Sequence, residues 1–341
     1  MTGLLIGADV GGTSTRVAIA DHRGMVRAVA RQPAGNPNAV GVDTSASRVR
    51  AAITDALGQL RGQEFDPDPV RSGIDAVVLG MAGFATALDA GAEFLAAALP
   101  DEVGSPTVRI VSDLAVGYAS ATPLPRGYVV IAGTGSGAAE VDRGEIIARR
   151  GSWGWLLGDE GAGFWLGREA VRNALLETER RLPYGPLTRA VLQALEIGPD
   201  DPTEALAGLT RVPYLSQPVK LAELAPYVTG LVDSDPAAAA ICARAADQLA
   251  RLVLDLQPMP GRPIVATGSV LQTPGPIRSA FTACVQQQLG SAVIDAHSGL
   301  VGSLWLAAGA AADRTAADGA GGDGLPDAPV HERLLATLDQ H

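Results

Sequence analysis

Three short turns of glycine and hydroxyl residues follow apolar segments of this 341-residue chain. Glycine lets the main chain approach a ligand closely, and phosphate oxygens accept hydrogen bonds from backbone N–H groups and hydroxyls. The turns contain Gly11, Gly12 and Thr13, then Gly133, Thr134, Gly135 and Ser136, and finally Gly268 and Ser269. One such turn alone would favour a purely structural interpretation. Two matched turns and a related third favour a site for a nucleoside triphosphate.

The spacing of these glycines excludes two common phosphate sites. GxxxxGK[ST] does not occur in the sequence, and the glycines at 7, 11 and 12 do not form GxGxxG before a helix, since a strand follows. Neither of the first two turns contains lysine. A divalent cation is therefore expected to offset the phosphate charge, and Asp9, just before the first turn, is placed to bind it. ATP and Mg²⁺ are the predicted cofactors.

Asp113 is the candidate general base for a hydroxyl acceptor. It ends the segment TVRIVSD and opens a helix-like segment, so the alternative is that it only caps this helix. Ligands of open α/β sheets bind at the carboxyl ends of strands, which is the position of Asp113. None of the four histidines lies near a motif. We therefore expect Asp113 to accept the proton of a hydroxyl that attacks the γ-phosphorus.

The segment RGSWGWLLGDEGAGFW, residues 150–165, has the composition of a sugar site. Its glycines allow backbone contacts with hydroxyls, and the carboxylate of Asp159 can accept hydrogen bonds from two adjacent hydroxyls. The alternative is that Asp159 and Glu160 begin the helix that follows, where acidic side chains favour the helix dipole. We expect Asp159 to bind substrate, and we expect Trp153 and Trp155 to be core residues rather than sugar platforms.

These residues need a framework that brings strand ends together. Residues 4–9, 14–21 and 25–32 read as three strands, and helices and strands then alternate up to residue 121. Such alternation is typical of a parallel sheet with helices on both faces, which makes the predicted fold α/β. Residues 127–142 repeat the opening pattern of strand, turn and strand, so we predict an internal duplication.

The rest of the chain supplies helices and one more strand. Residues 159–257 are mainly helical by pattern, with a long helix over 237–256, and residues 263–270 form a strand that leads into the third turn. A closing helix is expected at about 298–312. Residues 313–341 carry too little apolar surface to pack, so we expect a flexible tail.

Composition narrows the functional classes. Hydrophobic residues make up 47% and charged residues 18%, which allows a substantial core. The net charge of −11 disfavours nucleic acid as a partner, because a phosphate-backbone binder needs basic surface. The two cysteines, Cys242 and Cys284, lack the spacing of a metal site and read as core residues in a reducing compartment. Without a charged leader or a long apolar segment, we expect a cytoplasmic protein with no membrane partner.

The motifs DVGGT, VSDLAVG, IAGTGS, SWGWLLGDEGAGFW and ATGSV, in this order, resemble those of the N-acetylglucosamine kinase family, which neighbours the activator ATPases of benzoyl-CoA reductase. The resemblance spans about residues 4–312. It implies two ribonuclease-H-like lobes of the actin-like ATPase fold that close around ATP. The implied lobes are residues 1–114 with the helix at 298–312, and residues 115–297, followed by the tail at 313–341.

The resemblance also assigns roles residue by residue. Asp113 matches the family's catalytic aspartate, the first two turns match its phosphate loops, and Gly268 and Ser269 match its adenosine segment. The positions that match sugar contacts are Asn36, Gly151, Ser152 and Asp159. Two positions depart from the family pattern: Val10 stands where a glycine is usual, and Ser14 where a lysine is common. Relatives often pair, so a homodimer is implied.

The function that follows is ATP-dependent phosphorylation of N-acetyl-D-glucosamine at its 6-hydroxyl. Glucosamine or another hexose is an alternative acceptor, because nothing in the sequence locates an acetamido pocket. A second class, the activator ATPases, requires bridging cysteines near a dimer seam, and neither Cys242 nor Cys284 has that motif. A third class, a sugar-sensing regulator, requires a DNA-reading helix pair before the first strand, where this sequence has three residues.

Overall fold

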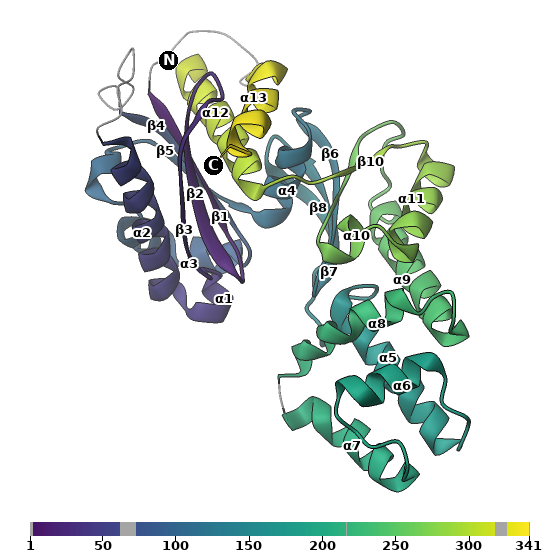
Figure 1. The fold of residues 1–341 in the computed structure, drawn as a ribbon. Helices are drawn as coiled ribbons and strands as arrows, with labels where there is room; N and C mark the ends of the chain where they lie inside the picture. The colour runs from purple at the N-terminus through teal and green to yellow at the C-terminus, as the bar shows by residue number, and fades with distance from the viewer. Residues whose placement is uncertain (1–2, 62–72, 216, 318–325, 341) are drawn as a thin grey trace. The chain divides into compact units, whose positions relative to one another are not determined.

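The computed structural model describes residues 3–61, 73–215, 217–317 and 326–340, which divide into two compact units (Figure 1). Unit 1 consists of Met1–Gly127, Val141–Ile147 and Ala296–His341, and unit 2 of Tyr128–Glu140 and Ala148–Asp295. The described residues form two five-stranded sheets, of which the first lies in unit 1 and most of the second lies in unit 2. The predicted α/β fold is confirmed.

The sheet of unit 1 has the strand order β3-β2-β1-β4-β5. The first three strands form an antiparallel meander, and β4 and β5 continue the sheet parallel to β1. The register pairs Asp9 with Arg16 and Val10 with Thr15. The loop between β1 and β2 therefore lies at the end of the sheet where the parallel strands β4 and β5 also finish. The strands are β1 (Leu4–Val10), β2 (Ser14–Asp21), β3 (Val26–Pro33), β4 (Ile74–Met81) and β5 (Thr107–Ser112).

Helices cover both faces of this sheet, as predicted (Figure 1). Alternation along β1 explains the two faces, because Leu4 and Ile6 enter a core with α2 and α3, whereas Leu5 enters a core with α4 and α12. The helices of unit 1 up to this point are α1 (Pro37–Val40), α2 (Val42–Leu60), α3 (Phe84–Ala98), η1 (Asp101–Val103), α4 (Asp113–Ala121) and α12 (Gly299–Ala317).

The second sheet repeats the topology of the first. Its order is β10-β9-β6-β7-β8, so the first strand of the meander is again central and two later strands extend the sheet beyond it. The predicted duplication is thereby confirmed. The strands are β6 (Arg126–Ala132), β7 (Ser136–Asp142), β8 (Glu145–Gly151), β9 (Ile264–Thr267) and β10 (Val293–Asp295).

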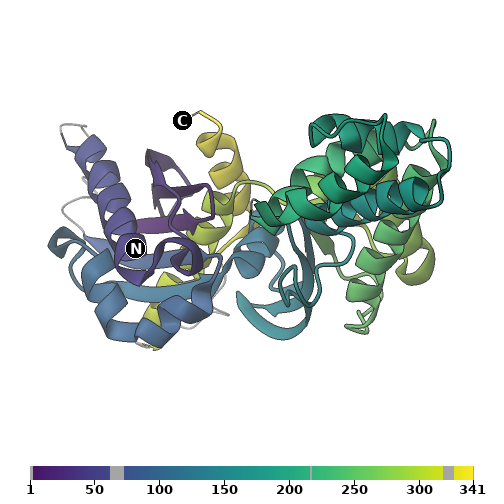
Figure 2. The ribbon, with the colours of Figure 1, turned by 90° about the horizontal axis from the view of Figure 1, so that it is seen from below.

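The predicted helical stretch makes up much of unit 2 (Figure 2). Helix α5 is central and contacts α6, α7, η2 and α8, while α9 packs against α11. Cys242 on α9 is 2% exposed, and Cys284 packs against the same core, as predicted for both cysteines. The helices are α5 (Gly163–Glu179), α6 (Pro186–Ala194), α7 (Pro202–Leu215), η2 (Pro218–Leu224), α8 (Ala225–Gly230), α9 (Pro236–Leu254), α10 (Ser269–Gln272) and α11 (Pro276–Leu289).

The unit boundaries differ from the predicted lobes. Helix α4, expected in the second lobe, belongs to unit 1, because Val116 packs in one core with Leu304 of α12. Residues Val141–Ile147 also belong to unit 1. Sequence periodicity shows that a helix has an apolar face but does not show which sheet this face covers.

The prediction of a flexible tail over 313–341 is wrong for the described part of that segment. Helix α12 extends to Ala317, and α13 (Ala328–Leu338) packs into the core of unit 1 with Leu334 fully buried. Residues 318–325 lie outside the described residues. The segment has few apolar residues overall, which is why the prediction failed. The apolar side chains at 330, 334, 335 and 338 nevertheless recur at helical spacing and form one apolar face.

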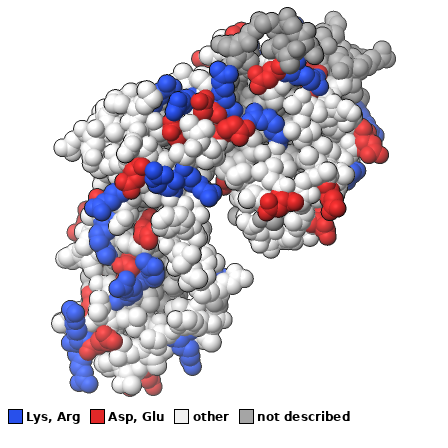
Figure 3. Space-filling view, turned by 180° about the vertical axis from the view of Figure 1, so that it is seen from behind, with Lys and Arg blue, Asp and Glu red and all other residues white. Residues whose placement is uncertain are grey.

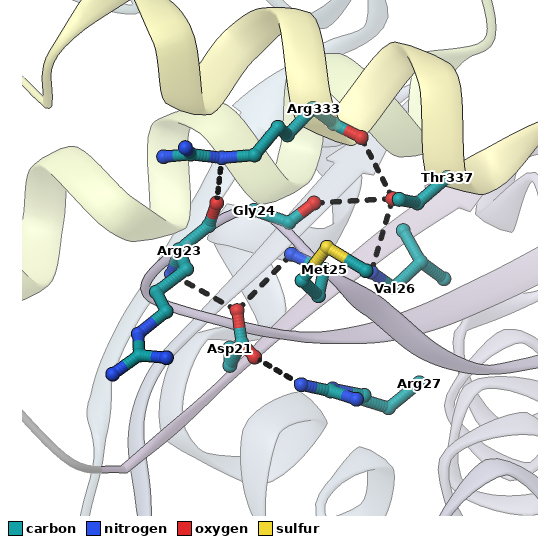
Figure 4. A network of polar contacts seen from close by, with 8 residues as sticks. All are labelled: Asp21, Arg23, Gly24, Met25, Val26, Arg27, Arg333 and Thr337. Atoms are coloured by element: carbon teal, nitrogen blue, oxygen red, sulfur yellow. Dashed lines mark hydrogen bonds and ion pairs between the residues drawn. The ribbon is translucent and has the colours of Figure 1, made fainter.

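Polar contacts fasten α13 to the turn between β2 and β3 (Figure 4). The Thr337 hydroxyl accepts from the Val26 N–H at 3.1 Å and lies 3.1 Å from the carbonyl oxygen of Gly24. Arg333 donates to the carbonyl of Arg23 in the same turn. Helix α13 is therefore an integral part of unit 1.

Acidic and basic side chains lie side by side on the face drawn in Figure 3. Ion pairs of the described residues include Arg251 with Asp247 and Arg278 with Asp295, both at 2.9 Å. Among these residues, no helix combines the length and apolar character needed to cross a membrane.

Candidate functional site

The first glycine turn forms a fixed loop at the carboxyl end of β1. We call residues 11–13 loop 1. The N–H of Gly11 donates to Ser14 O at 2.9 Å, and Gly11 O accepts from the N–H groups of Gly35 and Asn36 at 3.0 and 3.1 Å. Gly12 is exposed. Val10 points into the core and is 0% exposed, so this departure from the family pattern leaves the exposed part of the loop free of a bulky side chain.

Asp9 pairs with the positively charged side chain of Arg16, which the sequence did not lead us to expect. Arg16 lies opposite Asp9 in the β1–β2 register, and the two side chains form an ion pair. The three-residue loop between the strands puts positions 9 and 16 in register, and this spacing is the signal that identifies the pair in the sequence. Arg16 therefore adds a positive charge beside loop 1, where we expected a metal ion alone to offset phosphate charge.

Asp113 is the first residue of α4, directly after β5. The N-cap is Ser112, whose hydroxyl accepts from Leu114 N at 3.2 Å. Asp113 therefore does not hold the cap position that was its alternative interpretation. Burial, and secondly the negative charge of Asp9, raise the pKa of Asp113, against the opposing hydrogen bonds from Ser112 and Leu114. A raised pKa makes the ionised carboxylate a stronger base.

Asn36 lies beside loop 1 and also caps a helix. Its backbone N–H donates to Gly11 O at 3.1 Å, and its side-chain oxygen accepts from Asn38 N at 2.9 Å at the start of α1. These bonds agree with the interpretation of AGNPN as a local turn. The predicted sugar contact of Asn36 stays a prediction.

The donor set of unit 1 fits Mg²⁺ that arrives with ATP. Such ions are held by one or two carboxylates and otherwise by phosphates and water. Asp9 and Asp113 are two carboxylates near the end of the sheet that bears loop 1, close enough for Asp9 to act on the pKa of Asp113. Within the described ranges, no group of three or more His, Cys, Asp or Glu side chains could hold a metal ion.

The second glycine turn, residues 133–136, is bonded to the segment that follows β8. We call it loop 2. Ser136 N donates to Asp159 Oδ1 at 3.0 Å, and Ser136 Oγ donates to Glu160 O at 2.9 Å. Main-chain bonds continue this pairing, from Gly163 N to Gly133 O at 2.8 Å and from Phe164 N to Thr134 O at 3.2 Å. The predicted phosphate turn and part of the predicted sugar segment therefore form one hydrogen-bonded substructure of unit 2.

The third turn packs directly on loop 2. Gly268 has φ +87°, and a Cβ at this position would lie 2.5 Å from Ala132 C and O and 2.7 Å from Gly133 N. Only glycine fits this approach. Thr134, Ser269 and Val270 line one pocket of about 560 Å³, together with Ile277 and other residues of unit 2. A nucleoside fits a pocket of this size.

The backbone of residues 151–161 is unusual for a loop. Five of its residues have positive φ, and two of these, Ser152 at 59° and Asp159 at 61°, are not glycine. Ser152 N donates to Ser136 O at 2.9 Å. Asp159 is 8% exposed, and burial raises the pKa of its carboxyl group against the opposing bond from Ser136 N. Non-glycine residues with positive φ are uncommon and frequent at functional sites.

The prediction that both tryptophans of this segment are core residues is wrong. Trp153 is 66% exposed and Trp155 is 37% exposed, although the Trp155 ring lies 5.1 Å from that of Phe164. The neighbouring Leu156 and Leu157 are exposed as well. The segment is bonded to loop 2 at both of its ends, through Ser152 and Asp159, so the residues between project away from the core.

Each unit thus gathers its own share of the predicted residues. Unit 1 brings Asp9, loop 1, Asn36 and Asp113 to one end of its sheet, and unit 2 groups loop 2 with Gly151, Ser152, Asp159, Gly268 and Ser269. In chemical terms, unit 1 offers a buried carboxylate and a cationic side chain, and unit 2 offers a nucleoside-sized pocket beside backbone and hydroxyl donors.

Comparison with known proteins extends over nearly the whole chain. An N-acetyl-D-glucosamine kinase of Dictyostelium discoideum is 28% identical over 197 residues, which cover 57% of this chain and 61% of that protein, less than two thirds of its length. A solved structure from Chromobacterium violaceum, assigned as an N-acetylglucosamine kinase, is 26% identical with a TM-score of 0.69 and covers 90% of this chain and 99% of that chain. A second, from Porphyromonas gingivalis and assigned likewise, is 25% identical with a TM-score of 0.63 and covers 90% and 98%.

These likenesses establish the fold as the actin-like ATPase fold that sugar kinases share. The sequence pattern of the BadF/BadG/BcrA/BcrD ATPase family matches residues 6–307. Because this match covers most of the chain, the protein belongs to the BadF/BadG/BcrA/BcrD ATPase family.

Proposed function

We propose that the protein is an ATP-dependent sugar kinase that transfers the γ-phosphoryl group to the 6-hydroxyl of N-acetyl-D-glucosamine. The observation that carries the proposal is the likeness, over 90% of the chain, to two solved structures assigned as N-acetylglucosamine kinases. The Dictyostelium relative bears the same enzyme name.

The nucleotide part of the proposal rests on unit 2. The nucleoside is bound in the pocket lined by Ser269 and Val270, with loop 2 at one wall through Thr134. Loop 1 and Arg16 meet the phosphates through N–H groups and positive charge. Bound Mg²⁺, held by Asp9, would supply charge neutralisation on the phosphates.

The chemical step is assigned to Asp113. Its carboxylate accepts the proton of the acceptor hydroxyl as the hydroxyl oxygen attacks the γ-phosphorus. The bond from the γ-phosphorus to the bridging oxygen breaks, and ADP leaves with that electron pair. We assign the sugar contacts to Asn36, Gly151, Ser152 and Asp159, following the family pattern.

The cysteines favour a kinase over an electron-transferring activator. Cys242 is 2% exposed, and burial raises the pKa of its thiol to about 11, so the thiolate that ligates a cluster is disfavoured.

We also propose, from the family resemblance, that the protein is a cytoplasmic homodimer. Light scattering, which measures the mass of the protein in solution, tests whether it is a dimer.

The deciding experiment is a coupled ADP-release assay with N-acetylglucosamine, glucosamine, glucose and other hexoses. We expect turnover with N-acetylglucosamine and a 6-phosphate product by ³¹P NMR. A preference for glucosamine would correct the proposed acceptor, and ATP binding without phosphorylation of any sugar would overturn the proposal of a kinase.

A variant tests the role of Asp113 in the chemical step. Asp113→Ala should lower turnover by about 10²–10⁴-fold with ATP affinity retained. Unchanged turnover would remove Asp113 from its role.

A further inference from the structure

The carboxylate of Asp159 is built into the side of loop 2. One of its oxygens accepts from Ser136 N at 3.0 Å. The other faces Gly135, where a Cβ would lie 2.5 Å from it, so loop 2 and the carboxylate are packed without a side chain between them. Asp159 is 8% exposed and keeps a left-handed backbone with φ 61°. A buried side chain in a strained backbone is held there by its contacts.

The other bonds between loop 2 and this segment use the segment's main chain. Glu160 O accepts from Ser136 Oγ, while Gly163 N and Phe164 N donate to loop 2 carbonyls. These bonds fix backbone carbonyl groups of loop 2 and the Ser136 hydroxyl. The Asp159 carboxylate fixes an amide of loop 2 instead, and the orientation of amides decides how such a loop meets phosphate.

We propose that Asp159 is a positioning residue for the nucleotide, holding loop 2 in its phosphate-binding shape through Ser136 N and Gly135. This role goes beyond the sugar contact assigned to Asp159 above. If the same carboxylate also binds the acceptor, which rests on the proposed function, one side chain joins the acceptor and nucleotide sites. Binding of each ligand must then change the affinity for the other by the same factor.

The test measures binding of a non-hydrolysable ATP analogue without sugar, so it does not depend on turnover. Asp159→Gly removes the carboxylate and suits the positive φ at this position, which favours folding. We expect its dissociation constant for the analogue to rise about 10-fold or more. Asp159→Asn keeps an oxygen that accepts from Ser136 N, so its dissociation constant should stay within about threefold of wild type.

Asp235→Ala is the matched control. Asp235 is a second buried carboxylate of unit 2, 3% exposed, and it accepts from Leu187 N at 2.7 Å and Ala237 N at 2.8 Å, away from loop 2. Its loss should lower the unfolding temperature without changing analogue affinity.

Three results would overturn the inference. They are wild-type analogue affinity in Asp159→Gly, equal weakening in Asp159→Gly and Asp235→Ala, and equal weakening in Asp159→Gly and Asp159→Asn. None of these decides the proposed function, which depends on the sugar panel with the wild-type protein. Conversely, a wild-type protein that phosphorylates no sugar leaves the analogue measurement valid. With sugar present, the predicted coupling should disappear in Asp159→Gly.

Discussion

At the scale of single residues, Gly268 is a position where the structure leaves no room for a side chain. The carbon of Ala132 and the nitrogen of Gly133 occupy the space that a Cβ would need, and both are backbone atoms that cannot turn aside. We expect Gly268→Ala to shift the third turn away from loop 2 and to weaken ATP-analogue binding by about 10-fold or more, because a backbone clash must displace an entire turn. Isothermal titration calorimetry measures this change.

Gly290→Ala is the control for backbone strain at Gly268. Gly290 also has a positive φ, +62°, but no atom lies within 4 Å of a Cβ built there. The substitution should cost about 1–2 kcal/mol of stability without a change in analogue affinity. Equal binding by the two variants would show that contact between loop 2 and the third turn is unimportant for the nucleotide.

The raised pKa of Asp113 predicts how turnover and stability depend on pH. A base must be ionised, so the turnover number should rise with pH through an apparent pKa above the ordinary value of 3.8 and then level off. The folded state favours the neutral carboxyl, so ionisation of Asp113 lowers stability as pH rises from 3.8 through the raised pKa.

Asp113→Asn should therefore unfold at a higher temperature than wild type at pH 7 while losing turnover. Differential scanning calorimetry at pH 7 and pH 4 compares the two proteins. The stabilisation should shrink at pH 4, and an Asn variant less stable than wild type at pH 7 would contradict this assignment of the pKa.

At the scale of elements, the position of α4 depends on what holds its carboxyl end. Ala119 O near this end accepts from the buried ring of His331 on α13 at 2.8 Å, and Ser120 Oγ accepts from His297 N at 3.0 Å. Late carbonyls of a helix have no partner within it, so such contacts complete their hydrogen bonding. The C-terminal helix thus supports the helix whose first residue is Asp113.

His331 makes the docking of α13 sensitive to acid. Burial lowers its pKa below 6.5, opposed by the bond to Ala119, and the ring lies edge-on to Trp305 at 5.2 Å. His297 also lowers this pKa, whereas Glu332 raises it. Since the unfolded chain takes up the proton first, stability is complete above about pH 6.5 and is lost as the pH falls below it.

We expect wild-type protein to melt at a lower temperature at pH 5.5 than at pH 7.5, and His331→Gln to reduce this difference. His297→Gln, at an exposed position, should keep most of it. Melting curves at the two pH values provide the measurement. Identical pH dependence in wild type and His331→Gln would assign the effect to other groups.

At the scale of the whole molecule, each unit has its own sheet and its own core. The pocket beside loop 2 is lined by unit 2 alone. Adenosine, which carries no phosphate, should therefore protect amides of α8, α10 and α11 from hydrogen exchange and leave loop 1 unchanged. Hydrogen-exchange mass spectrometry tests this expectation. Protection by adenosine of loop 1 without protection of unit 2 would move the nucleoside out of this pocket.

The sequence by itself determined the parts of the protein that depend on local pattern. Alternating apolar residues predicted the meander β1–β3, and the repeated strand, turn and strand predicted the duplicated sheet topology. Glycine turns at strand ends marked loop 1, loop 2 and the third turn before any fold was known. These features follow from short-range periodicity and from backbone conformations that few residue types allow.

Only the tertiary structure decided contacts between segments distant in the sequence. It paired Asp9 with Arg16, turned Asp159 toward loop 2, exposed Trp153 and docked α13 on unit 1. The free energy of such contacts depends on which surfaces meet after folding, and composition fixes only that a surface is apolar or charged. An apolar ring such as that of Trp153 is core or surface according to the backbone that carries it, and that backbone is set by hydrogen bonds to loop 2.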